Sequence, residues 1–152
     1  MNKEQIPHPL QVKEIGALGA LTPCSLPIVS SDVQAGFPSP ADDYIENHLD
    51  LNELMIKRPA ATFFVRVEGD SMTGAGIDSG DTLVVDRSLE AADGRIIIAV
   101  INGEFTVKRF LKRGPKLAAE NPRYPDILIS ENLDFQVWGV VTYVIKSVCT
   151  SR

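Results

Sequence analysis

Five runs rich in β-branched and aromatic residues dominate the chain after Pro59. Gly, Asp or Asn residues separate these runs, as is typical of strands joined by turns. Asn102-Gly103 joins the third run to the fourth, and this dipeptide favours a tight hairpin of the primed-turn type. The sequence therefore predicts a mainly β fold, a small barrel or sandwich, with strands at residues 62–67, 82–86, 95–101, 104–111 and 135–145.

The segment before the strands has a different character. Residues 1–36 show no sustained hydrophobic period and contain several prolines and glycines, which predicts a mobile or loosely docked arm. Residues 36–40, Gly-Phe-Pro-Ser-Pro, then favour an extended and exposed hinge, because each proline disfavours a helical conformation of the residue before it. The predicted organisation is an extended N-terminal arm, residues 1–35, followed by a body, residues 36–152.

One or two short helices are expected between the hinge and the first strand. Ser39 can cap a helix with Pro40 at its first position and an apolar face that runs to residue 48 or 49. Asp50 and Glu53 have the spacing of a second helix cap and its acidic first turn. Both helices are expected to pack near the start of the β body.

Length and charge limit the classes of function. A chain of 152 residues with 44% hydrophobic content can bury one core but not two sizeable ones. The net charge of -5 provides no basic surface for phosphates, so direct duplex DNA binding is not expected. The expected partners are proteins.

Cysteine usage and the first thirty residues indicate the compartment. Cys24 and Cys149 are far apart, form no C-x-x-C pattern and have no nearby histidine pair, so we interpret them as reduced cysteines and expect no metal site. No apolar run near the N-terminus approaches a signal-peptide core or a membrane span of about 20 residues. We expect a cytoplasmic protein that uses no cofactor and has no membrane partner.

Ser71 is the first candidate for chemistry. It lies in Gly69-Asp70-Ser71-Met72-Thr73-Gly74, directly after the first predicted strand. A serine in a glycine-flanked turn at a strand end can expose its hydroxyl among backbone N–H groups, as an oxyanion site requires. The same residues are also common in ordinary turns, so this pattern alone does not indicate a nucleophile.

A serine nucleophile needs a base, and a lysine can provide it. His8 lies in the arm and His48 in a predicted helix, so neither suggests a Ser-His-Asp triad. Lys108 lies on a predicted hairpin strand and shares a face with Thr106 and Phe110. The pKa of a lysine is about 10.4, and burial can lower it by up to about 3–5 units, which makes a neutral amine accessible.

Each of these polar residues also has an ordinary structural interpretation. On its position alone, Lys108 is a solvated strand lysine, since lysines are rarely buried. Asp70, Asp81 and Asp86 are typical of turns and strand ends, rather than of an acid pair or a metal site.

Four motifs occur along the chain in a defined order: Ala35-Gly36, Gly-Asp-Ser-Met at 69–72, Gly-Asp at 80–81, and Glu-Phe-Thr-Val-Lys at 104–108. Taken together, they resemble the LexA/UmuD family of self-cleaving serine-lysine peptidases. The resemblance covers about residues 32–146, and residues 35–44 are very similar to the cleavage region of the UmuD branch. UmuD proteins often have Cys-Gly at the cut, whereas this chain has the Ala-Gly of LexA repressors and a longer arm before it.

The resemblance implies a role for each matching residue. Ser71 matches the nucleophile, Lys108 the general base, and Ala35-Gly36 the scissile bond, so that residues 1–35 are a cleavable leader. The backbone amides of Asp70 and Ser71 match the oxyanion donors. The implied fold is the small β peptidase domain found at the C-terminus of LexA.

The resemblance also implies partners. In the family, a RecA filament on single-stranded DNA promotes self-cleavage after DNA damage, in the SOS response. The shortened protein then joins a UmuC-like subunit to form the error-prone translesion DNA polymerase V, and homodimers are typical. The apolar run 137–145 is interpreted either as a central core strand covered on both faces or as part of a dimer surface.

Three alternatives remain to be weighed. A LexA-type repressor needs a DNA-reading helix-turn-helix before the cut, and residues 1–35 show no such pattern, so a truncated repressor is disfavoured. Signal peptidases use a serine-lysine pair but require a membrane anchor. The alternative from a different class is a non-enzymatic β-barrel interaction module, in which Ser71 and Lys108 are only surface polar residues.

Overall fold

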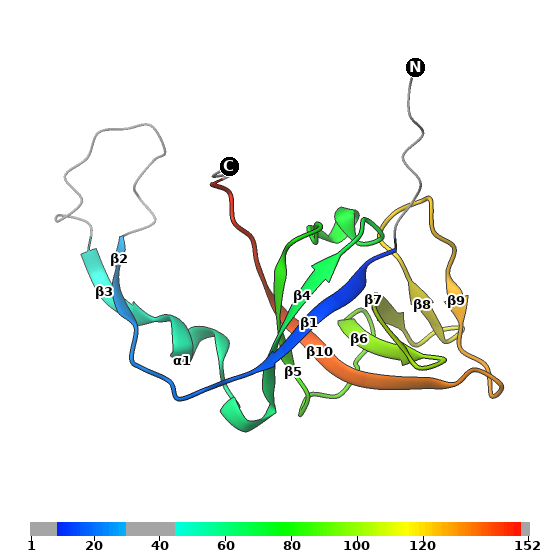
Figure 1. Ribbon diagram of the computed structural model, residues 1–152, viewed down its shortest axis with the longest axis horizontal. Helices are drawn as coiled ribbons and strands as arrows, with labels where there is room; N and C mark the ends of the chain where they lie inside the picture. Colours follow the sequence, from blue (N-terminus) through cyan, green and yellow to red (C-terminus); the bar gives the residue numbers. More distant parts are fainter. Residues whose placement is uncertain (1–8, 30–44, 150–152) are drawn as a thin grey trace, which may run out of the picture.

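Antiparallel strands form most of the secondary structure in the computed structural model, which describes residues 9–29 and 45–149. One sheet has the strand order β1-β4-β5-β10-β6-β7-β8-β9, and a further pairing of β1 with β7 closes its first six strands into a barrel. A second, two-stranded sheet pairs β2 with β3 beside the barrel (Figure 1). The strands are β1 Gln11–Ala17, β2 Ser25–Val29, β3 Ile45–Asp50, β4 Thr62–Glu68, β5 Thr82–Asp86, β6 Ile96–Ile101, β7 Glu104–Leu111, β8 Lys116–Ala118, β9 Ile127–Leu128 and β10 Phe135–Ile145.

The five predicted strands are confirmed, and they correspond to β4, β5, β6, β7 and β10. Two strand ends differ from the prediction by one residue: β4 ends at Glu68 rather than at residue 67, and β6 begins at Ile96 rather than at residue 95. Asn102 and Gly103 both have positive φ values, 50° and 82°, as a type I′ hairpin turn requires. The turn sets Ile101 opposite Glu104 and thereby fixes the register of β6 against β7.

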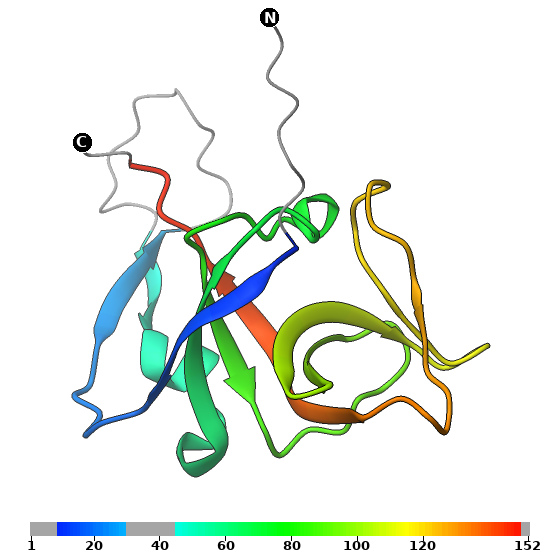
Figure 2. The same cartoon turned by 45° about the vertical axis from the view of Figure 1, so that its right-hand side comes forward.

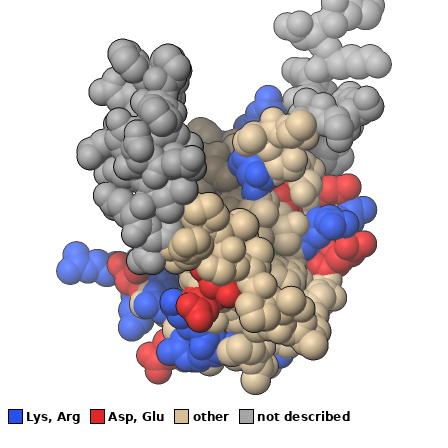
Figure 3. Space-filling view, turned by 90° about the vertical axis from the view of Figure 1, so that its left-hand side faces the viewer, with Lys and Arg blue, Asp and Glu red and all other residues tan. Residues whose placement is uncertain are grey.

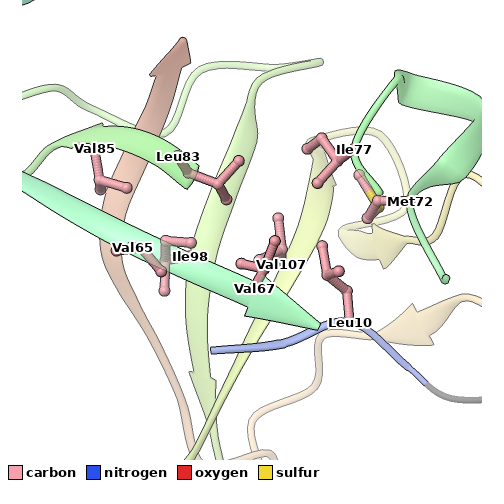
Figure 4. Packing of buried hydrophobic residues seen from close by; sticks show 9 residues of the cluster. All are labelled: Leu10, Val65, Val67, Met72, Ile77, Leu83, Val85, Ile98 and Val107. Carbon is pink, nitrogen blue, oxygen red and sulfur yellow. The ribbon is translucent and has the colours of Figure 1, made fainter. Parts of the chain in front are cut away.

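The barrel interior holds the main hydrophobic core. Alternate residues of β4 point inward, and consecutive residues of β5 are buried, as expected for strands that pack inside a small barrel. Figure 4 shows these side chains converging from several strands, with one contribution from the segment before β1. The buried members are Leu10, Val65, Val67, Met72, Ile77, Leu83, Val85, Ile98 and Val107.

A second cluster lies on the other side of β6. Ile97, Ala99, Leu117 and Val140 are its buried members. Leu117 belongs to β8, which extends the sheet beyond β7 and was not predicted, and neither was β9. Both strands are too short to show a period, and they form because β7 offers a free edge to β8 and β8 offers one to β9.

Of the two predicted helices, the second is confirmed, and the first is wrong over residues 45–49. Helix α1 spans Leu51–Met55, and the Asp50 carboxylate caps it by accepting from the amides of Asn52 (2.8 Å) and Glu53 (3.4 Å). Residues 45–49, expected at the end of the first helix, lie in β3 instead, because β2 pairs with them. The rest of that helix and the hinge at 36–40 fall outside the described residues. In the part of the chain that the structure describes, Pro59–Ala61 and Thr73–Ala75 form 3₁₀ turns.

The expectation of an irregular, loosely docked arm is wrong for residues 9–29. This segment contributes β1, which is one of the strands of the barrel wall, and β2, which belongs to the two-stranded sheet. Six of the seven residues of β1 are exposed, so the strand carries no hydrophobic alternation that the sequence could reveal. It forms because β4 and β7 provide hydrogen-bonding partners on both sides.

β10 lies centrally in the sheet, between β5 and β6, as predicted. The expectation that both its faces are covered is wrong at its C-terminal end, where Tyr143, Val144 and Ile145 are 38%, 37% and 42% exposed. The alternative of a dimer surface therefore stays open for this end of the strand.

The described surface offers no simple clue to a ligand. On the face shown in Figure 3, cationic and anionic side chains lie next to one another. Across residues 9–29 and 45–149, no helix is long and apolar enough to cross a membrane. The same residues contain no group of three or more His, Cys, Asp or Glu side chains that could hold a metal ion.

Candidate active site

Ser71 lies in the turn that follows β4. Gly69 has a φ of 116°, which a residue with a side chain rarely adopts, and it turns the chain away from the strand. The next hydrophobic residue, Met72, is fully buried in the barrel core. Because Met72 anchors the turn, Ser71 is drawn inward and is 0% exposed.

A second loop holds the Ser71 turn from the other side. The Asp70 carbonyl accepts from the Asn121 side-chain amide (2.8 Å), and the Ser71 carbonyl accepts from the Glu120 amide (2.9 Å). In a trans peptide the C=O and N–H groups point in opposite directions. The Ser71 N–H, which shares a peptide unit with the Asp70 carbonyl, therefore points away from Asn121, as a free oxyanion donor would need to.

Tyr124 completes this loop and reaches two parts of the site. Its hydroxyl donates to the Asp70 carboxylate, and its ring centroid lies 5.6 Å from the Lys108 amine. Burial and the hydrogen bond to Asp70 raise the pKa of Tyr124 to about 12. The hydroxyl therefore stays protonated, and remains a donor, through most of the alkaline range.

Lys108 lies on β7 and is only 5% exposed. Burial lowers the pKa of its amine below that of an ordinary lysine. The interpretation of Lys108 as a solvated strand lysine is therefore wrong. Phe110 shares the face of Lys108, as predicted: Ile97, opposite Lys108 in the register, belongs to the second cluster, against which Phe110 packs. The ring near the amine, however, is that of Tyr124.

Leu10 connects the serine to the β7 side of the site. Its amide donates to the Ser71 hydroxyl oxygen (2.9 Å), and its carbonyl accepts from the Thr106 hydroxyl on β7 (3.4 Å). Leu10 also lines a cavity of about 530 Å³ together with Lys108 and Tyr124. Ser71 itself lies among the buried residues behind Leu10 and is not on the cavity wall.

The structure describes Ser71 and Lys108 but not every predicted site residue. The structure brings Ser71 and Lys108 into one site, since Tyr124 contacts both Lys108 and the Ser71 turn. Ala35 and Gly36 lie outside the described residues. The roles of Ser71 and Lys108, and of the Asp70 and Ser71 amides, stay predictions.

The other polar residues have structural positions. Asp81 accepts from the Asp78 amide (2.8 Å) and the Lys146 amine (2.6 Å), which ties the end of β10 to the turn before β5. Asp86 ends β5 and caps the turn that follows by accepting from Ser88. These agree with their interpretation as turn and strand-end acids. His48 lies on β3.

Three residues at the site were not indicated by any sequence motif. Leu10 lies in the segment interpreted as irregular, and Asn121 and Tyr124 belong to a loop with no catalytic motif. The only available signal was the turn-forming composition of Asn121-Pro122-Arg123-Tyr124-Pro125. It indicates a loop but not what the loop contacts.

Comparison with known proteins supports the resemblance found in the sequence. Residues 27–142 match the Peptidase S24-like family. Protein ImpA of Salmonella typhimurium is 52% identical over 123 residues, which cover 78% of this chain and 82% of ImpA. Protein MucA of Escherichia coli is 46% identical over 127 residues, covering 82% of this chain and 87% of MucA. The LexA repressor of Proteus mirabilis is 39% identical over 128 residues, which cover 82% of this chain but 62% of the repressor.

Proposed function

Because this chain belongs to the Peptidase S24-like family, and to its UmuD-like group, we propose that it is a serine peptidase that cuts its own Ala35-Gly36 bond. Ser71 is the nucleophile and Lys108 the general base. The observation that carries the proposal is the buried Lys108 amine, whose pKa is lowered by burial in the same site as a buried serine. A structural lysine has no need of such an environment, whereas a general base does.

The reaction follows from these roles. The neutral Lys108 amine takes the Ser71 proton as the hydroxyl oxygen attacks the Ala35 carbonyl carbon. The Asp70 and Ser71 amides bind the oxygen that becomes negative. The Gly36 amine then leaves with the proton from Lys108, and water hydrolyses the ester between Ser71 and Ala35. The substrate is part of the same chain, so its effective concentration can be very high.

The cellular role is proposed from the UmuD-like group. In this proposal the protein acts in SOS mutagenesis in the cytoplasm, and a RecA filament on single-stranded DNA stimulates the cut. The processed body forms a homodimer and joins a UmuC-like subunit in an error-prone translesion polymerase. The net charge of -5 agrees with protein partners rather than direct contact with duplex DNA.

Mass spectrometry of the purified chain tests the peptidase activity. At neutral and then alkaline pH, the wild-type chain should yield a fragment that begins at Gly36, faster as the pH rises towards the pKa of Lys108. Ser71→Ala should give none, whereas Ser147→Ala, at an exposed serine outside the site, should cleave like the wild type. A wild-type chain that stays intact at alkaline pH, and also with activated RecA filaments, would favour the non-enzymatic interaction module.

A further inference from the structure

The segment that leads into β1 covers the candidate nucleophile. The Leu10 amide donates to the Ser71 hydroxyl oxygen (2.9 Å), and both residues are 0% exposed. In Figure 4 the Leu10 side chain points into the barrel core, towards Met72 and Val107. A substrate carbonyl must come within about 3–3.5 Å of the attacking oxygen. No other peptide can come that close while Leu10 is in place.

β1 occupies a groove between two strands that it bonds on both sides. It pairs antiparallel with β4 from Gln11↔Glu68 to Ala17↔Phe63, and Gln11 also pairs with Thr106 of β7. Figures 1 and 2 both show β1 crossing the barrel between β4 and β7. Leu10, directly before its first residue, bonds Ser71. A gap between two strand edges binds an extended peptide through main-chain hydrogen bonds. The site therefore has the form of a peptide-binding groove with a peptide already in it.

We propose that Leu10 and β1 act as an internal competitor of the scissile segment, so that the groove holds either β1 or the Ala35-Gly36 bond, never both. This inference rests on the proposed function. While β1 is bound, Ser71 is both covered and engaged as a hydrogen-bond acceptor. Cleavage therefore requires β1 to leave the groove first.

The way Leu10 binds explains why β1 is an occupant and not a substrate. It presents an amide N–H to the Ser71 oxygen, not a carbonyl carbon. The lone pair that accepts from this N–H is directed at a donor hydrogen and not at a carbonyl carbon. The Leu10 side chain, buried in the core, fixes this arrangement.

β1 also has the properties of a strand that can leave. Six of its seven residues are exposed, and Val12 is the exception. Its ion pairs, Lys13–Glu68 (3.1 Å) and Glu14–Arg66 (3.1 Å), lie on the surface, where such pairs stabilise little. Elements with few buried contacts open before the rest of a fold does. Leu10 is the main anchor that opening must release.

A disulfide staple across β1 and β4 tests whether β1 must leave. Glu14 and Arg66 are directly opposite each other in the register, so Glu14→Cys with Arg66→Cys can close a disulfide. The chain carries Cys24→Ser and Cys149→Ser, since both native cysteines are exposed. Samples are quenched in acid and then reduced before mass spectrometry, because the staple would otherwise hold the two fragments together.

The oxidised staple should slow the appearance of the fragment that begins at Gly36 by about tenfold or more, and reduction should restore it. The control staple, Arg66→Cys with Thr82→Cys, joins β4 to β5 and leaves β1 free. It should cleave equally fast in both redox states. Equal rates for the oxidised and reduced β1 staple would overturn the proposal.

A binding experiment separates this inference from the peptidase proposal. A fluorescent peptide of residues 30–42 is added to the β1-stapled chain that carries two further substitutions. Ser71→Ala prevents cleavage, and Ala35→Asp keeps the chain's own tethered segment from competing with the peptide. We expect the peptide to bind the reduced form and not the oxidised form, whether or not the parent chain cleaves itself. Equal binding to both forms, or no binding to the reduced form, would overturn the competition. Absence of cleavage in every reduced sample would instead contradict the proposed function.

Discussion

Lys108 holds a largely buried amine, and the burial of its charge has a cost in stability. Its pKa in the folded chain is lower than in the unfolded chain. Below the folded pKa the amine is charged in both states, so the full cost of burying the charge is present. The cost decreases as the pH rises through the folded pKa, and it is gone above the unfolded value of about 10.4.

Lys108→Met should therefore abolish cleavage and yet stabilise the fold at neutral pH. The lowered pKa means that the buried charge costs free energy in the folded state, so its removal should raise the Tm. Thermal unfolding in a Ser71→Ala background measures the gain, which should shrink towards alkaline pH. Lys112→Met, at an exposed lysine, should show no such gain, and a destabilised Lys108→Met at pH 7 would contradict the account.

Tyr124 is expected to have two separable effects on the reaction. Tyr124→Phe keeps the ring beside Lys108 but loses the hydrogen bond to Asp70, so the cleavage rate should fall while its pH midpoint stays. Tyr124→Ala should also move the midpoint to higher pH, because water gains access to the amine. Tyr124→Ala also removes a cation-π attraction that favours the charged amine, and this loss alone would move the midpoint to lower pH. The effect is small, because the 5.6 Å between the Lys108 amine and the ring centroid is near the limit of about 6 Å for such contacts. If the cleavage rates of Tyr124→Phe and Tyr124→Ala have the same pH midpoint, the Tyr124 ring does not shield the Lys108 amine from water.

At the level of residues, the sequence singled out Ser71 and Lys108 as candidates but not their surroundings. Both candidates rest on motifs that resemble those of a known family. Leu10, Asn121 and Tyr124 reach the site through long-range contacts, at sequence separations of 61, 51 and 54. No local pattern encodes such contacts.

At the scale of elements, the Ser71 turn and the loop around Glu120 meet so closely that one position needs a glycine for space. A Cβ on Gly74 would lie 2.6 Å from the Glu120 carbonyl oxygen, which the Gly74 amide also binds. Gly74→Ala should push the two segments apart, cost about 1–3 kcal/mol in stability and lower the cleavage rate. Gly19→Ala, whose Cβ would meet nothing within 4 Å, is the matched control. Wild-type cleavage in a folded Gly74→Ala would show that the loop does not position Ser71.

The elements that the sequence predicted are those with buried, β-branched residues. β5 and β6 are recognisable because each contains a run of consecutive buried side chains. β1 is not recognisable because it is almost entirely exposed, and the sequence of β3 does not predict a strand because a strand in a small outer sheet depends on its partner, β2. In both cases tertiary pairing, which a single sequence does not encode locally, decided the conformation.

For the whole molecule, the exposed end of β10 is the surface we assign to the proposed homodimer. Ile145→Asp should weaken dimerisation at least about tenfold, because an interfacial charge without a partner is costly. Analytical ultracentrifugation of the Ser71→Ala chain measures this, with Leu128→Asp on β9, 71% exposed, as the control. A wild-type chain that stays monomeric, or a dimer unaffected by Ile145→Asp, would rule out this surface.

The central claim is that Lys108 is the base, and its titration tests this most directly. NMR of the Ser71→Ala chain can follow the Cε of Lys108 with pH, while the rate of self-cleavage is measured in the wild type under the same conditions. We expect Lys108 to titrate below the ordinary lysine value of about 10.4 and to share its midpoint with the cleavage rate. A Lys108 that titrates with the exposed lysines, or a cleavage rate with an unrelated midpoint, would contradict the account.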